Sequence, residues 1–149
     1  MAESISQESG NNRLSGLLGQ DELAEAPTGA LPVQYTSLVG RVQEVAAVNT
    51  LLRRSEVRLL TLTGAGGVGK TRLGLQAAAE LIEDFADGVC FVPLAPLSDT
   101  ELVVPTIAQS FGFWEAEGQL LSNLLHAYLR DKHLLLVLDN FEQVVGAAL

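Results

Sequence analysis

The stretch that decides the fold is Gly64-Ala-Gly-Gly-Val-Gly-Lys-Thr71, which matches the pattern G-x-x-x-x-G-K-[ST] at every fixed position. Glycines let the backbone curl around an anion and turn successive N–H groups toward it. Lys70 can reach the outer phosphates of a nucleotide, and the Thr71 hydroxyl can bind Mg²⁺. From average residue usage, a chance match in a chain of this length is on the order of one per cent. The stretch therefore predicts a phosphate-binding loop.

The segments on either side of this loop support the same interpretation. Arg58-Leu-Leu-Thr-Leu-Thr63 is a β-branched and apolar run that predicts a buried strand. After the loop, Leu73, Ala77, Leu81 and Phe85 recur every four residues, which predicts a helix that ends before Asp87-Gly88. A glycine-rich surface turn is the competing interpretation, and the order strand, loop, helix disfavours it.

The rest of the chain alternates helical and strand patterns. Apolar residues at helical spacing predict a helix that begins near Val42 and has Arg53 and Arg54 in its closing turn. The same spacing predicts a second helix that contains Pro105 in its first turn and ends near Gly112, and a third over 120–129. Further strands are predicted at Val89–Val92 and His133–Leu138. Strands that are apolar on both faces, alternating with helices, indicate a parallel sheet covered on two sides. We therefore expect an α/β protein of the three-layer α/β/α type.

Composition limits the kind of protein. The chain has 149 residues, a formal net charge of −9 and one cysteine, Cys90. The acidic balance argues against a broad nucleic-acid surface, and a single cysteine excludes an internal disulfide or a cysteine-rich metal site. We find neither a signal peptide nor an apolar run near the ~20 residues of a membrane span, and we expect a cytoplasmic protein. Residues 1–31 are expected to form a flexible arm and residues 32–149 the domain.

An acidic partner for the loop follows the last predicted strand. Asp139 stands directly after the apolar run Leu134–Leu138, where it can hold Mg²⁺, although it could also simply begin a turn. The next residue is Asn140, and an amide cannot accept a proton from water at neutral pH. Glu142 is the nearest alternative base, with a first-turn glutamate as its competing interpretation. We therefore expect catalytic roles for Asp139 and Glu142, with slow turnover.

Four blocks of the sequence resemble a known family. They are Thr36–Arg41 (TSLVGR), Leu60–Leu73 (LTLTGAGGVGKTRL), Gly88–Ala95 (GVCFVPLA) and Leu134–Glu142 (LLLVLDNFE). Together they are similar to consecutive blocks of bacterial STAND ATPases, which are P-loop NTPases related to NB-ARC and AAA proteins and occur in large LuxR-type and similar transcriptional regulators. The resemblance covers about residues 32–149. A rival class, the ParA/MinD-like ATPases, carries a lysine where this chain has Ala65, and is disfavoured.

The resemblance implies an ATP- or ADP-binding signalling module with Mg²⁺ as its metal. Val39 and Gly40 would contact adenine through their backbone, although Gly40 could equally well only cap the turn into the first helix. Thr71 and Asp139 would be the metal ligands. The remaining nucleotide-binding positions would be Gly64, Ala65, Gly66, Gly67, Val68, Gly69, Lys70, Thr71 and Arg72.

The resemblance also implies parts that would follow Leu149. In the family, a sensor strand lies between the P-loop strand and the Asp139 strand, and a helical lid, a winged-helix segment and an effector follow it. We therefore expect a domain truncated before the sensor strand, whose two strands either pair directly or leave polar edges open, with weak nucleotide affinity. Self-association and an effector are the expected partners in the parent protein, with no membrane contact. The alternatives are a small P-loop kinase-like enzyme and a non-catalytic remnant that acts through protein contacts.

Overall fold

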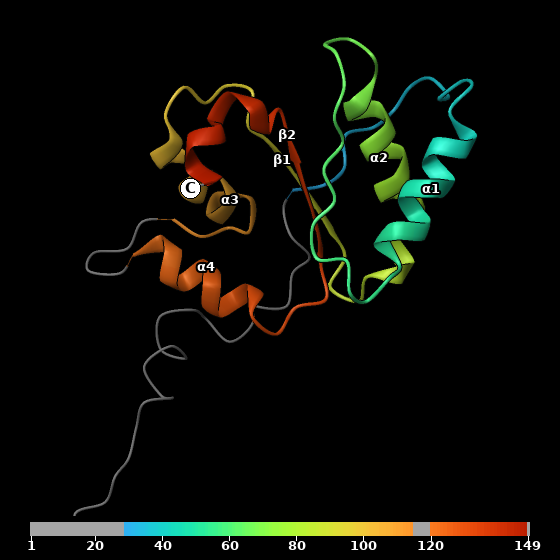
Figure 1. Cartoon of the computed structure of the whole chain (residues 1–149). Helices are drawn as coiled ribbons and strands as arrows, with labels where there is room; N and C mark the ends of the chain where they lie inside the picture. The colour runs from blue at the N-terminus through green and yellow to red at the C-terminus, as the bar shows by residue number, and fades with distance from the viewer. Residues whose placement is uncertain (1–28, 115–119, 149) are drawn as a thin grey trace, which may run out of the picture.

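The structure, a computed structural model, describes residues 29–114 and 120–148 (Figure 1). Most of the expected arm, residues 1–28, lies outside this part. The elements are α1 (Val42–Leu52), α2 (Lys70–Glu80), η2 (Ile82–Asp84), β1 (Val89–Pro93), η3 (Thr100–Leu102), α3 (Val103–Ser110), α4 (Leu121–Leu129), β2 (Leu135–Asp139) and η4 (Phe141–Ala148). The predicted helices form, although α2 ends at Glu80, earlier than expected, and η2 follows it. Two of the three predicted strands are confirmed.

The two strands form a parallel sheet at the centre of the molecule. β1 pairs with β2 in a register that runs from Val89 opposite Leu135 to Pro93 opposite Asp139. In Figure 1, α1 and α2 lie on one side of this sheet and α3 and α4 on the other. The predicted three-layer α/β/α arrangement is thereby confirmed for the described residues. Because the strands are parallel, Asp139 and the turn after Pro93 share the carboxyl edge, where ligands of α/β proteins bind.

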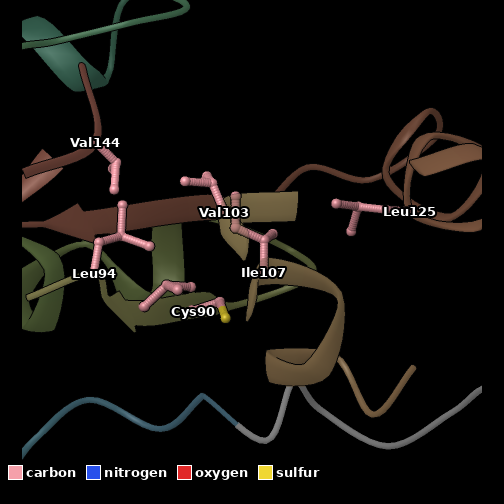
Figure 2. Close-up of a cluster of buried hydrophobic side chains, with 7 residues drawn as sticks. Cys90, Leu94, Val103, Ile107, Leu125 and Val144 are labelled. Atoms are coloured by element: carbon pink, nitrogen blue, oxygen red, sulfur yellow. The ribbon is translucent and has the colours of Figure 1, made fainter. Parts of the chain in front are cut away.

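The larger core lies between the sheet and the helices α3 and α4. Its buried side chains come from β1, the turn after it, α3, α4 and η4, as Figure 2 shows for six of them, and they are Cys90, Val92, Leu94, Val103, Ile107, Leu125 and Val144. Fixing these elements costs conformational entropy, which burial of apolar side chains offsets. Pro105 fits near the start of α3, because its missing N–H lies in the first turn.

A second core packs α1 against α2 on the opposite side. Val45, Val48 and Ala77 are buried there, and Leu60 and Leu62 pack against them. These leucines belong to the segment that leads into the phosphate loop, so the same cluster fixes the loop's entry and the helix that follows it.

The predicted strand at Arg58–Thr63 is wrong for the described residues. No backbone hydrogen bond joins this segment to β2 or to any other described residue. Leu60 and Leu62 face the helices, whereas Leu59 is 84% exposed. The alternating pattern is that of a strand with one covered face, but a strand also needs a hydrogen-bonding neighbour. We expected the two strands either to pair directly or to leave polar edges open. The segment does not pair with β2, so the backbone polar groups of Arg58–Thr63 are left without a strand partner among the described residues.

A cluster of polar contacts fastens the amino ends of the two strands. The Asp87 carboxylate accepts hydrogen bonds from Lys132 Nζ at 2.9 Å and from the backbone N–H of His133 at 2.7 Å. The Asp87 backbone N–H donates to the His133 carbonyl, and the Phe85 and His133 rings stack. The hydrogen bonds from Lys132 and His133 hold the pKa of Asp87 below its ordinary value of 3.8. The start of the sheet is thus fixed opposite the carboxyl edge.

Gly29 is the first described residue and adds to the other edge of β1. Its carbonyl accepts from the Phe91 N–H at 2.9 Å, and its own N–H donates to the Ser110 carbonyl at 3.2 Å. A Cβ at this position would lie 2.6 Å from the Cys90 sulfur, so only glycine fits without movement.

Within residues 29–114 and 120–148, no helix has both the length and the apolar character needed to cross a membrane.

Candidate nucleotide-binding site

The phosphate loop, Gly64–Thr71, joins the open segment Arg58–Thr63 to α2. Gly67 and Gly69 have φ angles of +78° and +87°, in the left-handed region that favours glycine. Gly69 is the residue before α2, and helix begins at Lys70. The first N–H groups of α2 therefore have no partner within the helix, and together with the helix dipole they favour an anion at the loop.

Lys70 extends back across the loop that precedes it. Its Nζ donates to the Gly64 carbonyl at 2.9 Å and to the Ala65 carbonyl at 3.2 Å. These two bonds hold the ammonium group at the start of the loop, on the side where the chain enters. A phosphate bound over the loop would meet this positive charge as well as the backbone N–H groups.

The most informative contact joins the loop to the sheet. Thr71 Oγ1 donates to Asp139 Oδ1 at 2.7 Å, across 68 positions of sequence. The predicted metal pair is therefore brought together by the packing of α2 beside β2. Both groups are hard oxygen donors, the type that Mg²⁺ prefers, and Mg²⁺ sites commonly use one or two protein ligands together with phosphate oxygens and water. The donor set fits Mg²⁺.

No other metal centre competes with this pair in the described part of the chain. Residues 29–114 and 120–148 contain no group of three His, Cys, Asp or Glu side chains that could hold a metal ion. A transition-metal site built from several such ligands is therefore not formed by these residues.

The turn after β2 places the remaining candidate catalytic residues. Asn140 has a φ of +59°, which asparagine tolerates better than most residues, so the chain reverses directly after Asp139. The Glu142 side chain is exposed, and its Oε1 lies 3.5 Å from Asn140 Nδ2. Glu142 thus lies close to the carboxyl edge of β2, and its contact in the structure is with Asn140.

The predicted adenine-contacting residues lie on the approach to α1. Val39 is 85% exposed, and Gly40 has a φ of +74°. The neighbouring Arg41 donates from Nη2 to the Val68 carbonyl in the loop at 3.2 Å, and forms an ion pair with Glu44 at 3.0 Å. Val39 and Gly40 are therefore attached to the phosphate loop through the side chain that follows them. The pattern of the sequence did not indicate this role for Arg41.

A hollow of about 170 Å³ lies between Arg41, the segment Thr61–Thr63, loop residues Val68–Lys70 and Leu73. Pockets that enclose small ligands are roughly 300–1,000 Å³. The hollow is smaller, so a nucleotide on the loop would be partly open to solvent in this arrangement.

Arg72, the last residue of the predicted nucleotide-binding set, is hydrogen-bonded to the segment before α1. Its Nη2 donates to the Thr36 carbonyl at 2.8 Å, to Thr36 Oγ1 at 2.9 Å and to the Ser37 carbonyl at 3.2 Å. The structure therefore brings together Lys70, Thr71 and Asp139, and directs Arg72 toward the segment that carries Val39 and Gly40.

This chain is similar to a known domain family and to several known proteins. The NB-ARC domain family matches residues 41–145. "Putative HTH-type transcriptional regulator Rv0890c" of Mycobacterium tuberculosis is 40% identical over 90 residues, which are 60% of this chain and 10% of that protein. "Uncharacterized protein Rv0894" of the same organism is 37% identical over 112 residues, 75% of this chain and 28% of that protein.

A more distant relative comes from a cyanobacterium. "Uncharacterized WD repeat-containing protein alr2800" of Nostoc is 29% identical over 120 residues, 72% of this chain and 10% of that protein. The chain thus spans only a small part of the length of these relatives. No solved structure matches it. The family match covers both the phosphate loop and Asp139, and it confirms the resemblance inferred from the sequence. The chain therefore belongs to the NB-ARC domain family of P-loop NTPases, and the matched residues 41–145 include the phosphate loop.

Proposed function

We propose that this chain binds ATP or ADP together with Mg²⁺ and serves as the nucleotide switch of a STAND-type regulator. The observation that carries the proposal is the 2.7 Å hydrogen bond between Thr71 Oγ1 and Asp139 Oδ1. A glycine-rich turn alone would explain the loop. It would not explain a hydroxyl and a carboxylate from positions far apart in sequence that meet beside the start of α2.

Each residue has a separate task in this proposal. The backbone N–H groups from Ala65 to Lys70 surround the β-phosphate, and the Lys70 ammonium approaches the outer phosphates. Thr71 and Asp139 hold Mg²⁺, which neutralises phosphate charge when bound. Val39 and Gly40 offer backbone contacts to the adenine base, by analogy with the family.

Hydrolysis is expected to be slow. Asn140 cannot take a proton from the attacking water, and the exposed Glu142 is the remaining candidate for this task. A slow step suits a switch in which ATP and ADP favour different arrangements of the surrounding protein. Fast multiple turnover that Glu142→Gln leaves unchanged would contradict this part of the proposal.

The place of the module in a regulator rests on its relatives. One relative is named as an HTH-type transcriptional regulator, so we propose that the chain acts within a regulator of transcription in the cytoplasm. The net charge of −9 disfavours direct contact of this chain with nucleic acid. Self-association and an effector segment are the partners proposed for the larger protein.

Titration calorimetry of the chain with ATP, ADP and GTP, with and without Mg²⁺, tests the proposal. Lys70→Ala should abolish measurable binding of all three nucleotides. Asp139→Asn should remove the effect of Mg²⁺, whereas Asp131→Asn is a matched control, because Asp131 is exposed and has no hydrogen bond or ion pair to described residues. Adenine nucleotide binding that ignores both Lys70→Ala and Mg²⁺ would refute it. Complete absence of binding would favour a non-catalytic role through protein contacts.

A further inference from the structure

The side chain of Arg72 is hydrogen-bonded to a segment far away in the sequence. Arg72 is half-buried and follows Thr71 in the first turn of α2. Its Nη2 carries two hydrogens and reaches three oxygens, two on Thr36 and one on Ser37, so at least one hydrogen is shared. Hydrogen bonds from a guanidinium are charge-assisted, and arginine's planar donor group loses little freedom when it forms several of them.

These bonds are the polar attachment of an otherwise exposed segment. Among the described residues, the backbone of Leu31–Gly40 has no hydrogen bond to the rest of the protein except those accepted from Arg72. Val33, Tyr35 and Val39 are each more than 70% exposed, so apolar packing contributes little at these positions. Leu38 is the partly buried residue that joins this segment to the core of α1 and α2.

The segment is attached to the phosphate loop at its other end. Arg41 donates to the Val68 carbonyl inside the loop. The two arginines thus link the same two parts of the chain, namely the segment before α1 and the phosphate loop with the first turn of α2. Arg72 reaches from beside the loop to Thr36 and Ser37, and Arg41 reaches from the end of the segment back to the loop. Val39 and Gly40 lie between the two attachments.

We propose that Arg72 is a positioning residue, which holds Thr36–Gly40 beside the phosphate loop so that this segment can contact the nucleoside part of a bound nucleotide. The proposal rests on the proposed function for the identity of the ligand. It assigns Arg72 to the base and ribose side of the site, since its guanidinium is directed to Thr36 and Ser37.

The test compares two ligands that share their phosphates. Arg72→Ala should weaken ATP binding by about tenfold, the expected scale for loss of charge-assisted hydrogen bonds. Binding of inorganic tripolyphosphate should stay unchanged, because the loop, Lys70 and Thr71 remain. Arg72→Lys should fall between the wild type and the alanine variant, since an ammonium keeps donors on a shorter side chain. Arg58→Ala is the matched control, as Arg58 is exposed and has no hydrogen bond or ion pair to described residues.

A second measurement needs no ligand. The heteronuclear ¹⁵N NOE of residues 36–40, which reports fast backbone motion, should fall in Arg72→Ala and stay at the wild-type value in Arg58→Ala. Thr36→Val removes one of the three acceptors and should produce a smaller fall. In a double-mutant cycle, Thr36→Val should add nothing once Arg72 is absent, because the two changes remove the same interaction.

The outcomes are separable. Equal loss of ATP and tripolyphosphate binding would mean that Arg72 acts on the phosphates, which overturns the proposal. Unchanged NOE values over residues 36–40 would overturn it as well. If the wild type binds neither ligand, the proposed function fails, and the unchanged or lowered NOE values still decide whether Arg72 holds the segment.

Discussion

A glycine-to-alanine pair within the phosphate loop separates backbone strain from crowding. A Cβ added to Gly69 meets no atom within 4 Å, and the same is true of Gly66. The two positions differ in backbone conformation, because Gly69 has a φ of +87° whereas Gly66 lies outside the positive region. Gly69→Ala therefore tests the left-handed backbone alone, and Gly66→Ala is its matched control.

The expected magnitude follows from this comparison. An L-residue in the left-handed region costs roughly 1–2 kcal/mol. Alanine also reduces the freedom of the unfolded chain, a stabilising effect of about 0.4–1 kcal/mol at a compatible position. Both variants share the second effect. The free energy of unfolding of Gly69→Ala should therefore be about 1–2 kcal/mol lower than that of Gly66→Ala, while Gly66→Ala should equal or slightly exceed the wild type.

Equilibrium urea unfolding, followed by circular dichroism, measures this difference. The strain is transmitted to global stability because Gly69 directly precedes α2, which packs against α1 through Ala77. The denaturant slopes of the variants should agree, since neither substitution changes the surface exposed on unfolding. Equal free energies of unfolding for Gly66→Ala and Gly69→Ala would refute the assignment of strain to Gly69.

Three further predictions concern the sheet and its core. The pKa of Asp87 is held below 3.8 by Lys132 and His133, so its stabilising effect is fully present above the unfolded-state pKa and is lost as pH falls through the folded-state pKa. Asp87→Asn should therefore be less stable than the wild type at pH 7, with the gap in urea midpoint narrowing as the pH falls below 3.8; a constant gap would contradict this. Burial raises the pKa of the Cys90 thiol to about 11, so a thiol reagent at pH 8 should react with Cys90 only at the rate of unfolding, and rapid labelling of the native protein would disprove its burial. Leu94, fully buried, should lose about 2–5 kcal/mol of unfolding free energy on mutation to alanine, measured against the half-buried Leu97→Ala, for which a smaller loss is expected.

The elements that sequence patterns predicted well are those whose signal is local. Val45 and Val48 recur at helical spacing, and both are buried in α1. The apolar run before Asp139 forms β2, and its pairing with β1 is parallel as expected. These patterns report which face of an element is apolar, and burial of that face is the main force in folding.

The segment Arg58–Thr63 shows where local patterns are insufficient. Its apolar and β-branched residues are typical of strands, and Leu60 and Leu62 are covered by helices. Whether such a run becomes a strand depends on a neighbouring backbone that can complete its hydrogen bonds, and no pattern within the run reports that neighbour. The described residues supply none.

The phosphate loop is predictable from the sequence alone, because the glycines, Lys70 and Thr71 act within one short stretch of chain and their spacing is the signal. Which distant groups join the loop depends on the tertiary structure. Thr71 meets Asp139, and Arg72 turns to Thr36, through the packing of α2 beside the sheet and the segment before α1. Such contacts depend on the relative placement of whole elements, which is fixed by two separate apolar cores and not by residue spacing.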